Sequence, residues 1–371
     1  MNPTSEYGFV PIWGRGGYLQ GEQPDEIVRG CREEWEKLRA AYLAASGSGS
    51  GGLMGTVSFA GDFRFGVYRR WRRSPAPWRE EAWRKHREKT PPRSCELPVA
   101  SSRTGRSEFL AMIQEAQEYI RSGDIYLVNL ARRLRWELRA DPFRLWECLL
   151  AEDRPAGRGF LKTESGWLLS ASPELFLRIR GRRIETRPIK GTLRRSGPQG
   201  AASPLPLQVN PKERAELLMV TEVERNDLGR ICCLGTVRVR RFAAATRHAH
   251  LWHLYASVEG VLRPETDPVS ALFSCLPGGS ITGAPKRRAT EILLLLEPEP
   301  RGLYTGVFGY IDFSGNAAFT MTIRSLEVGS ETISLSVGSG ITIDSNPAAE
   351  YEETSLKAKS WEKALRSYAA G

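Results

Sequence analysis

The pattern of hydrophobic and polar positions is clearest between residues 109 and 138. Apolar residues from Phe109 to Ile120 recur at the spacing of one helical face, and Ser122-Gly123 follows as a C-terminal cap would. From Val128 to Leu138, apolar and polar residues alternate, which is the period of a strand with one buried face. The sequence therefore predicts a helix that leads directly into a strand.

Further strands and helices follow in irregular succession. Strands are expected at 158–163, 166–171, 174–180, 182–187, 235–242, 253–262, 304–313, 317–327 and 331–338, and helices at 142–151, 211–225, 268–274, 285–296 and 347–366. Strands in hairpin-like order, interrupted by helices, are typical of an α+β protein with mixed or antiparallel sheets. No Gly-x-Gly-x-x-Gly turn or Walker A run is present, which disfavours a dinucleotide-binding fold.

The first hundred residues show a different organisation. Ile27, Cys31, Trp35 and Leu38 stand at helical spacing, so a helix is expected over about 25–45. A glycine- and serine-rich connector follows at 46–52, and residues 53–68 indicate a hairpin.

The formal net charge of +10 is concentrated in one segment. Between Arg69 and Arg93 there are ten Lys or Arg residues against three Asp or Glu residues. Tryptophans between the arginines could stack on bases, but a solvated, arginine-rich excursion over 69–94 is the simpler interpretation, and no nucleic-acid partner is expected.

Other features of the composition indicate a globular protein of the cytoplasm. No run approaches the ~18 apolar residues that a membrane helix needs, and the N-terminus lacks the pattern of a signal peptide. Six cysteines include no Cys-x-x-Cys pair. We therefore expect reduced thiols, no membrane association and a cytoplasmic location.

Two pairs of glutamates are candidates for a metal site. Glu213 and Glu216 lie three residues apart near the start of one predicted helix, and Glu350 and Glu353 repeat this spacing in the last helix. Carboxylates three apart share a helical face, although such a face is usually only solvated. Together, the four could hold Mg²⁺, with water and an anionic substrate as the remaining ligands.

Three further motifs could carry chemistry. The glycine-rich turn at 277–284 leads into a helix whose first N–H groups could bind an anion. Lys190 follows a predicted strand that ends near Arg187, a position where a lysine is usually solvated. His248, His250 and His253 could suggest zinc, but no fourth ligand stands at a familiar spacing.

Taken in order, these motifs resemble the chorismate-utilising enzymes, which include anthranilate synthase component I, aminodeoxychorismate synthase component I, isochorismate synthase and salicylate synthase. The resemblance spans about residues 105–366. It is carried by Ser172-Pro-Glu, Pro188-Ile-Lys-Gly-Thr, Val223-Glu-Arg-Asn-Asp-Leu-Gly-Arg, Ile281-Thr-Gly-Ala-Pro-Lys, Gly309-Tyr-Ile, Ile323-Arg and Glu350-Tyr-Glu-Glu-Thr. So many motifs in the order of the family exclude chance.

The resemblance implies roles for residues at matching positions. Glu213, Glu216, Glu350 and Glu353 would surround Mg²⁺, which would hold the ring carboxylate of chorismate. The substrate would also be bound by Tyr310 and Arg324 at its enolpyruvyl carboxylate, by backbone N–H groups of Gly283, Ala284 and Gly340, and by Lys357. His253 would lie near the reacting edge of the ring.

Two positions distinguish reactions within the family. Enzymes that activate water carry a lysine where this chain has Leu127, and leucine cannot accept a proton. Anthranilate synthases typically read Pro-Ile-Ala-Gly-Thr, whereas aminodeoxychorismate synthases have lysine at the position of Lys190. Aminating relatives usually carry glutamine at the position of Leu127, which is a departure here.

The resemblance therefore implies Mg²⁺-dependent amination of chorismate at C4 to give 4-amino-4-deoxychorismate, on the route to para-aminobenzoate and folate, with Lys190 as a covalent nucleophile at C2. Ammonia would come from a separate glutamine amidotransferase subunit. Anthranilate synthase and a non-catalytic chorismate-binding protein remain as alternatives.

The implied fold is an α/β sandwich of two similar halves, each with a large, mostly antiparallel sheet, that enclose the site with helices outside. Residues 1–100 would form a short N-terminal part interwoven with the core, and residues 101–371 the chorismate-binding catalytic core, within one structural domain.

Overall fold

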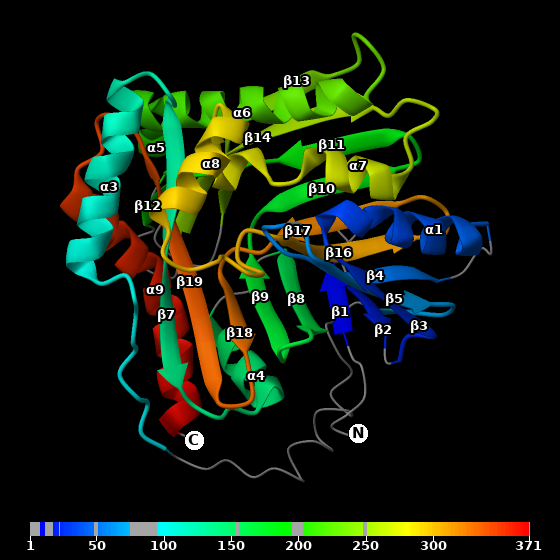
Figure 1. The fold of residues 1–371 in the computed structure, drawn as a ribbon, viewed down its shortest axis with the longest axis horizontal. Helices are drawn as coiled ribbons and strands as arrows, with labels where there is room; N and C mark the ends of the chain where they lie inside the picture. Colours follow the sequence, from blue (N-terminus) through cyan, green and yellow to red (C-terminus); the bar gives the residue numbers. More distant parts are fainter. Residues whose placement is uncertain are drawn as a thin grey trace.

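The computed structural model describes residues 8–11, 18–21, 23–47, 51–74, 95–152, 156–194, 203–247 and 251–370. Over these ranges, the chain forms two large sheets with helices packed against them (Figure 1). Neighbouring strands in both sheets are antiparallel. The predicted α+β class with antiparallel sheets is confirmed.

The first sheet is centred on a long strand pairing. Leu127–Glu137 pairs with Thr332–Ile341, from Glu137 opposite Thr332 to Val128 opposite Ile341. Across this sheet, the described strands are β15 (Gly283–Ala284), β7 (Leu127–Glu137), β19 (Thr332–Ile341), β18 (Ser325–Val328), β9 (Trp167–Ser172), β8 (Gly157–Lys162), β1 (Gly8–Pro11), β2 (Tyr18–Gly21) and β6 (Arg72–Ser74).

The strand that contains Lys190 lies at one edge of the second sheet. Across this sheet, the described strands are β12 (Ile189–Arg194), β14 (Leu251–Val261), β11 (Arg183–Arg187), β10 (Leu175–Arg180), β17 (Ala317–Met321), β16 (Val307–Asp312), β4 (Gly52–Val57), β5 (Phe63–Tyr68) and β3 (Glu26–Gly30), and β13 (Arg238–Arg247) pairs with β14. Strands from the first 74 residues therefore join both sheets.

Helices pack on both sheets. Three helices pack on the first sheet: α3 (Arg106–Arg121), α4 (Pro142–Glu152) and α9 (Pro347–Ala370). Three others pack on the second sheet: α1 (Trp35–Ala45), α5 (Leu205–Val209) and α6 (Pro211–Ile231). Helix α7 (Pro268–Cys275) packs on α1 and α6, and α8 (Lys286–Leu296) packs on β7 and β15. Short 3₁₀ turns are η1 (Arg32–Glu34) and η2 (Gly279–Ile281).

Two of the points at which the chain passes from one sheet to the other are neighbours. One lies between β9 and β10, at Pro173 and Glu174, and the other lies between β17 and β18, at residues 322–324. Backbone hydrogen bonds join the two crossings, from the Met321 N–H to the Glu174 carbonyl (3.1 Å) and from the Ala171 N–H to the Arg324 carbonyl (3.0 Å). The two sheets therefore share a hydrogen-bonded seam.

Most predicted elements are confirmed within a few residues, but two predictions are wrong. Residues 26–30 form β3 instead of the start of a helix, because they pair with β5 and the helix begins only at Trp35. Residues 317–327 form two strands in different sheets, with Arg324 at a positive φ of 48° between them. The pattern of apolar and polar residues along a strand does not show which sheet the strand joins.

Some sequence features lie outside the described residues. These include residues 75–94 of the arginine-rich excursion, together with His248 and His250. In the described part of the chain, no helix combines the length and apolar character needed to cross a membrane.

The buried face of β19 offers a test of the fold. Leu335 is fully buried in the core of the first sheet, so Leu335→Ala should lower the free energy of unfolding by about 2–5 kcal/mol in urea titrations. Leu294→Ala is the matched control, because that side chain is 70% exposed, and its effect should stay within about 0.5 kcal/mol. Equal effects of both changes would contradict this packing.

Candidate active site

Lys190 is positioned by a β-bulge in β12. The pairing of β12 with β14 shifts between Lys190, opposite Leu254, and Thr192, opposite His253, so Gly191 is the extra residue. Gly191 has a φ of +75°, which favours glycine. Lys190, which is predicted to follow the end of a strand, therefore lies inside a strand of its own, beside a bulge that interrupts the regular alternation of side chains.

The Lys190 ammonium meets the first sheet at Gly340 of β19. A Cβ atom at Gly340 would lie 3.3 Å from Lys190 Nζ, 3.4 Å from Leu127 Cδ1 and 3.7 Å from Glu216 Oε2. A larger residue at this position would crowd all three groups. The structure thus brings together Lys190 from the second sheet, Leu127 and Gly340 from the first, and Glu216 from α6.

Burial lowers the pKa of Lys190. The residue keeps some accessible surface, but its ammonium is enclosed by protein atoms, so the charged form loses hydration. Glu216 opposes this shift, whereas the positive charge of Lys357 adds to it. The net direction favours the neutral amine, which is the nucleophilic form.

The four glutamates lie near the N-terminal ends of two helices. Glu213 and Glu216 stand in the first turns of α6, which is capped by Asn210, and Glu350 and Glu353 stand in the first turns of α9. Burial raises the pKa of both Glu213 and Glu216. Neighbouring carboxylates raise it further, whereas Lys190 and Lys212 oppose the rise, most strongly at Glu216. The set is an excess of negative charge that a cation would stabilise.

Lysines and serines hold two of these carboxylates. Glu350 accepts hydrogen bonds from Ser339 and Ser345, and Lys212 Nζ lies 3.8 Å from Glu350 Oε1. Lys357 Nζ lies 2.6 Å from Glu353 Oε1 and also donates to the Gly338 carbonyl. Burial would raise the pKa of Glu353, but Lys357 holds it below its usual range.

Within the described ranges, no three acidic, histidine or cysteine side chains stand close enough to hold a metal ion as they are placed. The donors are nonetheless the carboxylate oxygens that a hard cation such as Mg²⁺ prefers. The raised pKa values of Glu213 and Glu216 indicate that their charges are under-compensated. The residues present therefore fit such a cation in chemistry and charge.

His253 and Arg324 form a pair beside the bulge. The Arg324 guanidinium donates to His253 Nε2 (3.0 Å), so the ring proton is on Nδ1, which donates to the Gly191 carbonyl (3.0 Å). Both ring nitrogens are engaged in these contacts, and this leaves the zinc interpretation without support from His253. The histidine also ties Arg324 of one crossing to the bulge that carries Lys190.

The tyrosine predicted from the motif, Tyr310, lies in different surroundings. It packs in an apolar cluster with Met54 and Phe308, and its ring meets Trp71 edge-on at 5.8 Å. A second tyrosine, Tyr304, precedes it in the same chain segment.

Tyr304 lies beside the strand that carries Gly340. Its hydroxyl would lie 2.8 Å from a Cβ at Gly338, two residues before Gly340. Burial raises the pKa of Tyr304, and the charge of Glu174 contributes to this shift. The phenol therefore lies near Gly338, where the charges of Arg301 and Glu297 act on it more strongly than that of Glu174.

Gly283 and Ala284 lie at the edge of the first sheet. They form β15, opposite Val128 and Leu127 of β7. A Cβ at Gly283 would lie 2.0 Å from the Leu127 carbonyl oxygen, and its φ is +152°. Glycine is therefore required for the glycine-rich loop to reach the strand that carries Leu127.

Sequence reasoning assigns no role to Glu174. This carboxyl is buried at the first crossing, accepts a hydrogen bond from Ser280, and feels the charge of Lys190. Burial, with a smaller contribution from Glu224, raises its pKa to about 8. The signal available in the sequence is a charged residue between two strongly apolar strands, in the motif Ser172-Pro-Glu.

Several known proteins resemble this chain in sequence. The family model described as chorismate binding enzyme matches residues 55–363. Anthranilate synthase component 1 of Thermus thermophilus is 40% identical over 72% of this chain and 58% of its own length. Aminodeoxychorismate synthase component 1 of Bacillus subtilis is 35% identical over 73% of this chain and 61% of its own length. The chain thus spans about three-fifths of these curated relatives.

Solved structures share the fold. A putative 2,3-dihydroxybenzoate-specific isochorismate synthase from Bacillus anthracis superposes with a TM-score of 0.80 at 22% identity, covering 97% of this chain and 96% of that one. Anthranilate synthase component I from Streptococcus pneumoniae gives 0.75 at 24% identity, over 97% and 90%. The architecture, the motifs and the family match lead to one conclusion: this chain belongs to the chorismate-binding enzyme family.

Proposed function

We propose that this enzyme aminates chorismate at C4 to give 4-amino-4-deoxychorismate, with Lys190 as the covalent nucleophile. The observation that carries the proposal is the position of the desolvated Lys190 amine, beside Gly340 and Leu127 at the meeting of the two sheets. A lowered pKa increases the fraction of the neutral amine, which is the form that can attack carbon. Members of the family without a lysine here lack that nucleophile.

The proposed reaction consists of two displacements. The neutral Lys190 amine forms a bond to C2, both double bonds of the ring diene shift, and the C4 hydroxyl leaves with a proton as water. Ammonia then forms a bond to C4, both double bonds shift back, and the C2–N bond to Lys190 breaks. The amine takes its electron pair and is ready for another turnover.

Leu127 supports amination over addition of water. Its Cδ1 lies near the point where Lys190 meets Gly340, and its side chain is buried. A leucine can neither remove a proton from water nor donate a hydrogen bond to it. Attack at C2 is therefore left to the lysine, and hydroxylation of the ring is disfavoured.

Mg²⁺ is the proposed cofactor. Glu213, Glu216, Glu350 and Glu353 would hold it, in place of the lysine contacts that compensate part of their charge. When bound, the ion would neutralise the ring carboxylate of chorismate and stabilise the charge that develops in the ring.

The remaining residues would orient the substrate. Arg324, held by His253, is suited to a bidentate contact with the enolpyruvyl carboxylate, and Tyr304 is proposed beside it in place of Tyr310. The proposed anion-binding surface is completed by Lys357 and by the main chain of Gly283, Ala284 and Gly340.

Glu174 is proposed as the acid that protonates the departing C4 hydroxyl. With a pKa of about 8, its carboxyl keeps its proton at neutral pH, and it lies close enough to Lys190 for their charges to interact. Ser280 fixes its orientation through a hydrogen bond. A buried, protonated carboxyl is well matched to this task.

Ammonia is proposed to come from a glutamine amidotransferase partner. The relatives at 35–40% identity carry the name component 1, which is consistent with a second component in those enzymes. A separate partner would release ammonia by hydrolysing glutamine.

The product is the first test of this function. Purified protein with chorismate, Mg²⁺ and ammonium should form aminodeoxychorismate, which an added lyase converts to para-aminobenzoate for detection. Omission of Mg²⁺, with a chelator present, should abolish turnover, and re-addition should restore it. Fluorescent anthranilate or isochorismate as the main product would exclude C4 amination.

Substitution of Lys190 tests the nucleophile. Lys190→Ala should reduce kcat by about 10³-fold or more, and Lys190→Arg should be equally impaired, because guanidinium keeps its charge and cannot attack carbon. Wild-type enzyme given chorismate without ammonia should show an adduct of chorismate minus water on Lys190 by mass spectrometry. Substantial activity in Lys190→Arg would show that only the positive charge matters.

The pH profile tests Lys190 and Glu174 together. Activity should rise with pH as Lys190 loses its proton, since its pKa is lowered, and fall near pH 8 as Glu174 loses its proton. Glu174→Gln, which cannot titrate, should lose activity and also the fall near pH 8. A fall that persists in the folded variant would assign the alkaline limb to another group.

A further inference from the structure

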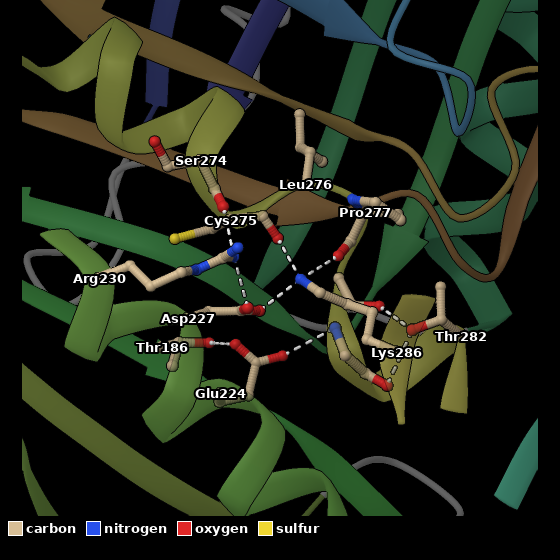
Figure 2. A network of polar contacts seen from close by, with 12 residues as sticks. Thr186, Glu224, Asp227, Arg230, Ser274, Cys275, Leu276, Pro277, Thr282 and Lys286 are labelled. Carbon is tan, nitrogen blue, oxygen red and sulfur yellow. Dashed lines mark hydrogen bonds and ion pairs between the residues drawn. The ribbon is translucent and has the colours of Figure 1, made fainter. Parts of the chain in front are cut away.

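A buried polar network lies behind the candidate site, between α6 and the glycine-rich loop (residues 277–284) (Figure 2). At its centre, Lys286 Nζ donates to the Asp227 carboxylate, to the Pro277 carbonyl at 2.8 Å and to the Cys275 carbonyl at 3.1 Å. An ammonium has three donors, so all of them are used. Lys286 thus binds the end of α7 and the start of the loop to α6.

Asp227 is the buried counterion of this lysine. Its side chain is 1% exposed and also accepts from Arg230 at 2.8 Å. Arg230 in turn donates to the Ser274 carbonyl in α7 at 2.9 Å. Two cations and one carboxylate therefore fix the C-terminal end of α7, from which the glycine-rich loop departs.

Glu224, about one helical turn before Asp227, connects the loop to the strand that leads to Lys190. One carboxylate oxygen accepts from the Gly279 N–H at 3.0 Å, and the other accepts from the Thr186 hydroxyl at 3.2 Å. Thr186 lies in β11, four residues before Lys190. A single buried side chain thus spans the loop and the second sheet.

The other side of the loop is bonded to the strand that carries Leu127. The carbonyl of Thr282 accepts from the Asn129 N–H at 2.8 Å, and that of Ala284 accepts from the Tyr126 N–H at 2.7 Å. These two bonds lie on either side of Leu127.

The loop also contacts the proposed acid. Ser280, which follows Gly279, donates a hydrogen bond to Glu174. A shift of the loop would therefore move Ser280 away from Glu174 and Gly283 away from Leu127 at the same time.

We propose that Lys286, together with Asp227 and Glu224, is a positioning group for the active site: it sets the glycine-rich loop so that Ser280 orients Glu174 and the main chain of the loop meets the substrate. This inference rests on the proposed function in placing chorismate at this site and in taking Glu174 as the acid. The three residues act through the loop and not on the reacting atoms.

The test removes the charges as a pair. The double variant Lys286→Met with Asp227→Asn leaves neither member of this ion pair as an unpaired buried charge, which favours folding. It should keep its melting temperature to within about 5 °C but lose about tenfold or more in kcat/KM for chorismate, with a raised KM, because the loop is misplaced. Chorismate consumption is followed, so the result does not depend on which product forms.

The matched control removes a second ion pair at the opposite end of α7. Arg39 Nε lies 2.7 Å from Oδ2 of Asp267, the N-cap residue of that helix. Arg39→Met with Asp267→Asn keeps a capping side chain and should leave kcat/KM within about twofold. A general loss of rigidity in α7 would instead affect both double variants and would count against a specific role of Lys286.

Combination with Ser280→Ala identifies the route of the effect. If Lys286 acts through the loop, Ser280→Ala should lower kcat/KM by a much smaller factor in the double variant (Lys286→Met with Asp227→Asn) than in the wild type.

Lys286→Arg is the second variant. It keeps the positive charge, but the planar guanidinium cannot donate to the same three acceptors, so kcat/KM should fall by at least about fivefold. Wild-type kinetics in either folded variant, or fully multiplicative effects with Ser280→Ala, would overturn the proposal.

Discussion

The loss of hydration at the Lys190 ammonium is the constraint on which the rest of the site depends. The bulge at Gly191 directs the lysine toward the other sheet, Gly340 leaves room for it, and Leu127 offers it no polar side chain. Such burial would be unfavourable for a permanent charge. It becomes useful when the neutral amine is the working form, with the nearby carboxylates limiting how far the pKa falls.

The surrounding charges follow from the same constraint. Carboxylates on the first turns of α6 and α9 are stabilised by helix dipoles, yet burial and mutual repulsion leave Glu213 and Glu216 with raised pKa values. Lys212 and Lys357 compensate part of this charge. The site is therefore suited to exchange these protein cations for an ion and an anionic substrate, whereas Arg324 is held in place by a neutral histidine.

Local sequence patterns predict most elements because helical and strand periodicities are local properties. They miss β3, which depends on pairing with β5, and the break after β17, where two apolar strands enter different sheets. Family motifs single out Lys190 and the glutamates, whereas the motif Ser172-Pro-Glu contains Glu174 without indicating its role, and no motif points to Tyr304. The roles proposed for these two residues come from their burial among chain segments that are distant in sequence, and the tyrosine chosen from a motif, Tyr310, packs in an apolar cluster.

The seam between the sheets has a consequence for how ligands enter and leave. Its two crossings are hydrogen-bonded to each other through the main chain of Glu174 and Arg324, so a hinge motion that separated the sheets would break backbone bonds and dismantle the site. Ligand exchange should therefore take place at the rim formed by the N-terminal parts of α6 and α9, where the side chains of Lys212 and Glu353 are about half exposed. Such an arrangement would leave ligand exchange to the side chains at this rim, without separation of the sheets.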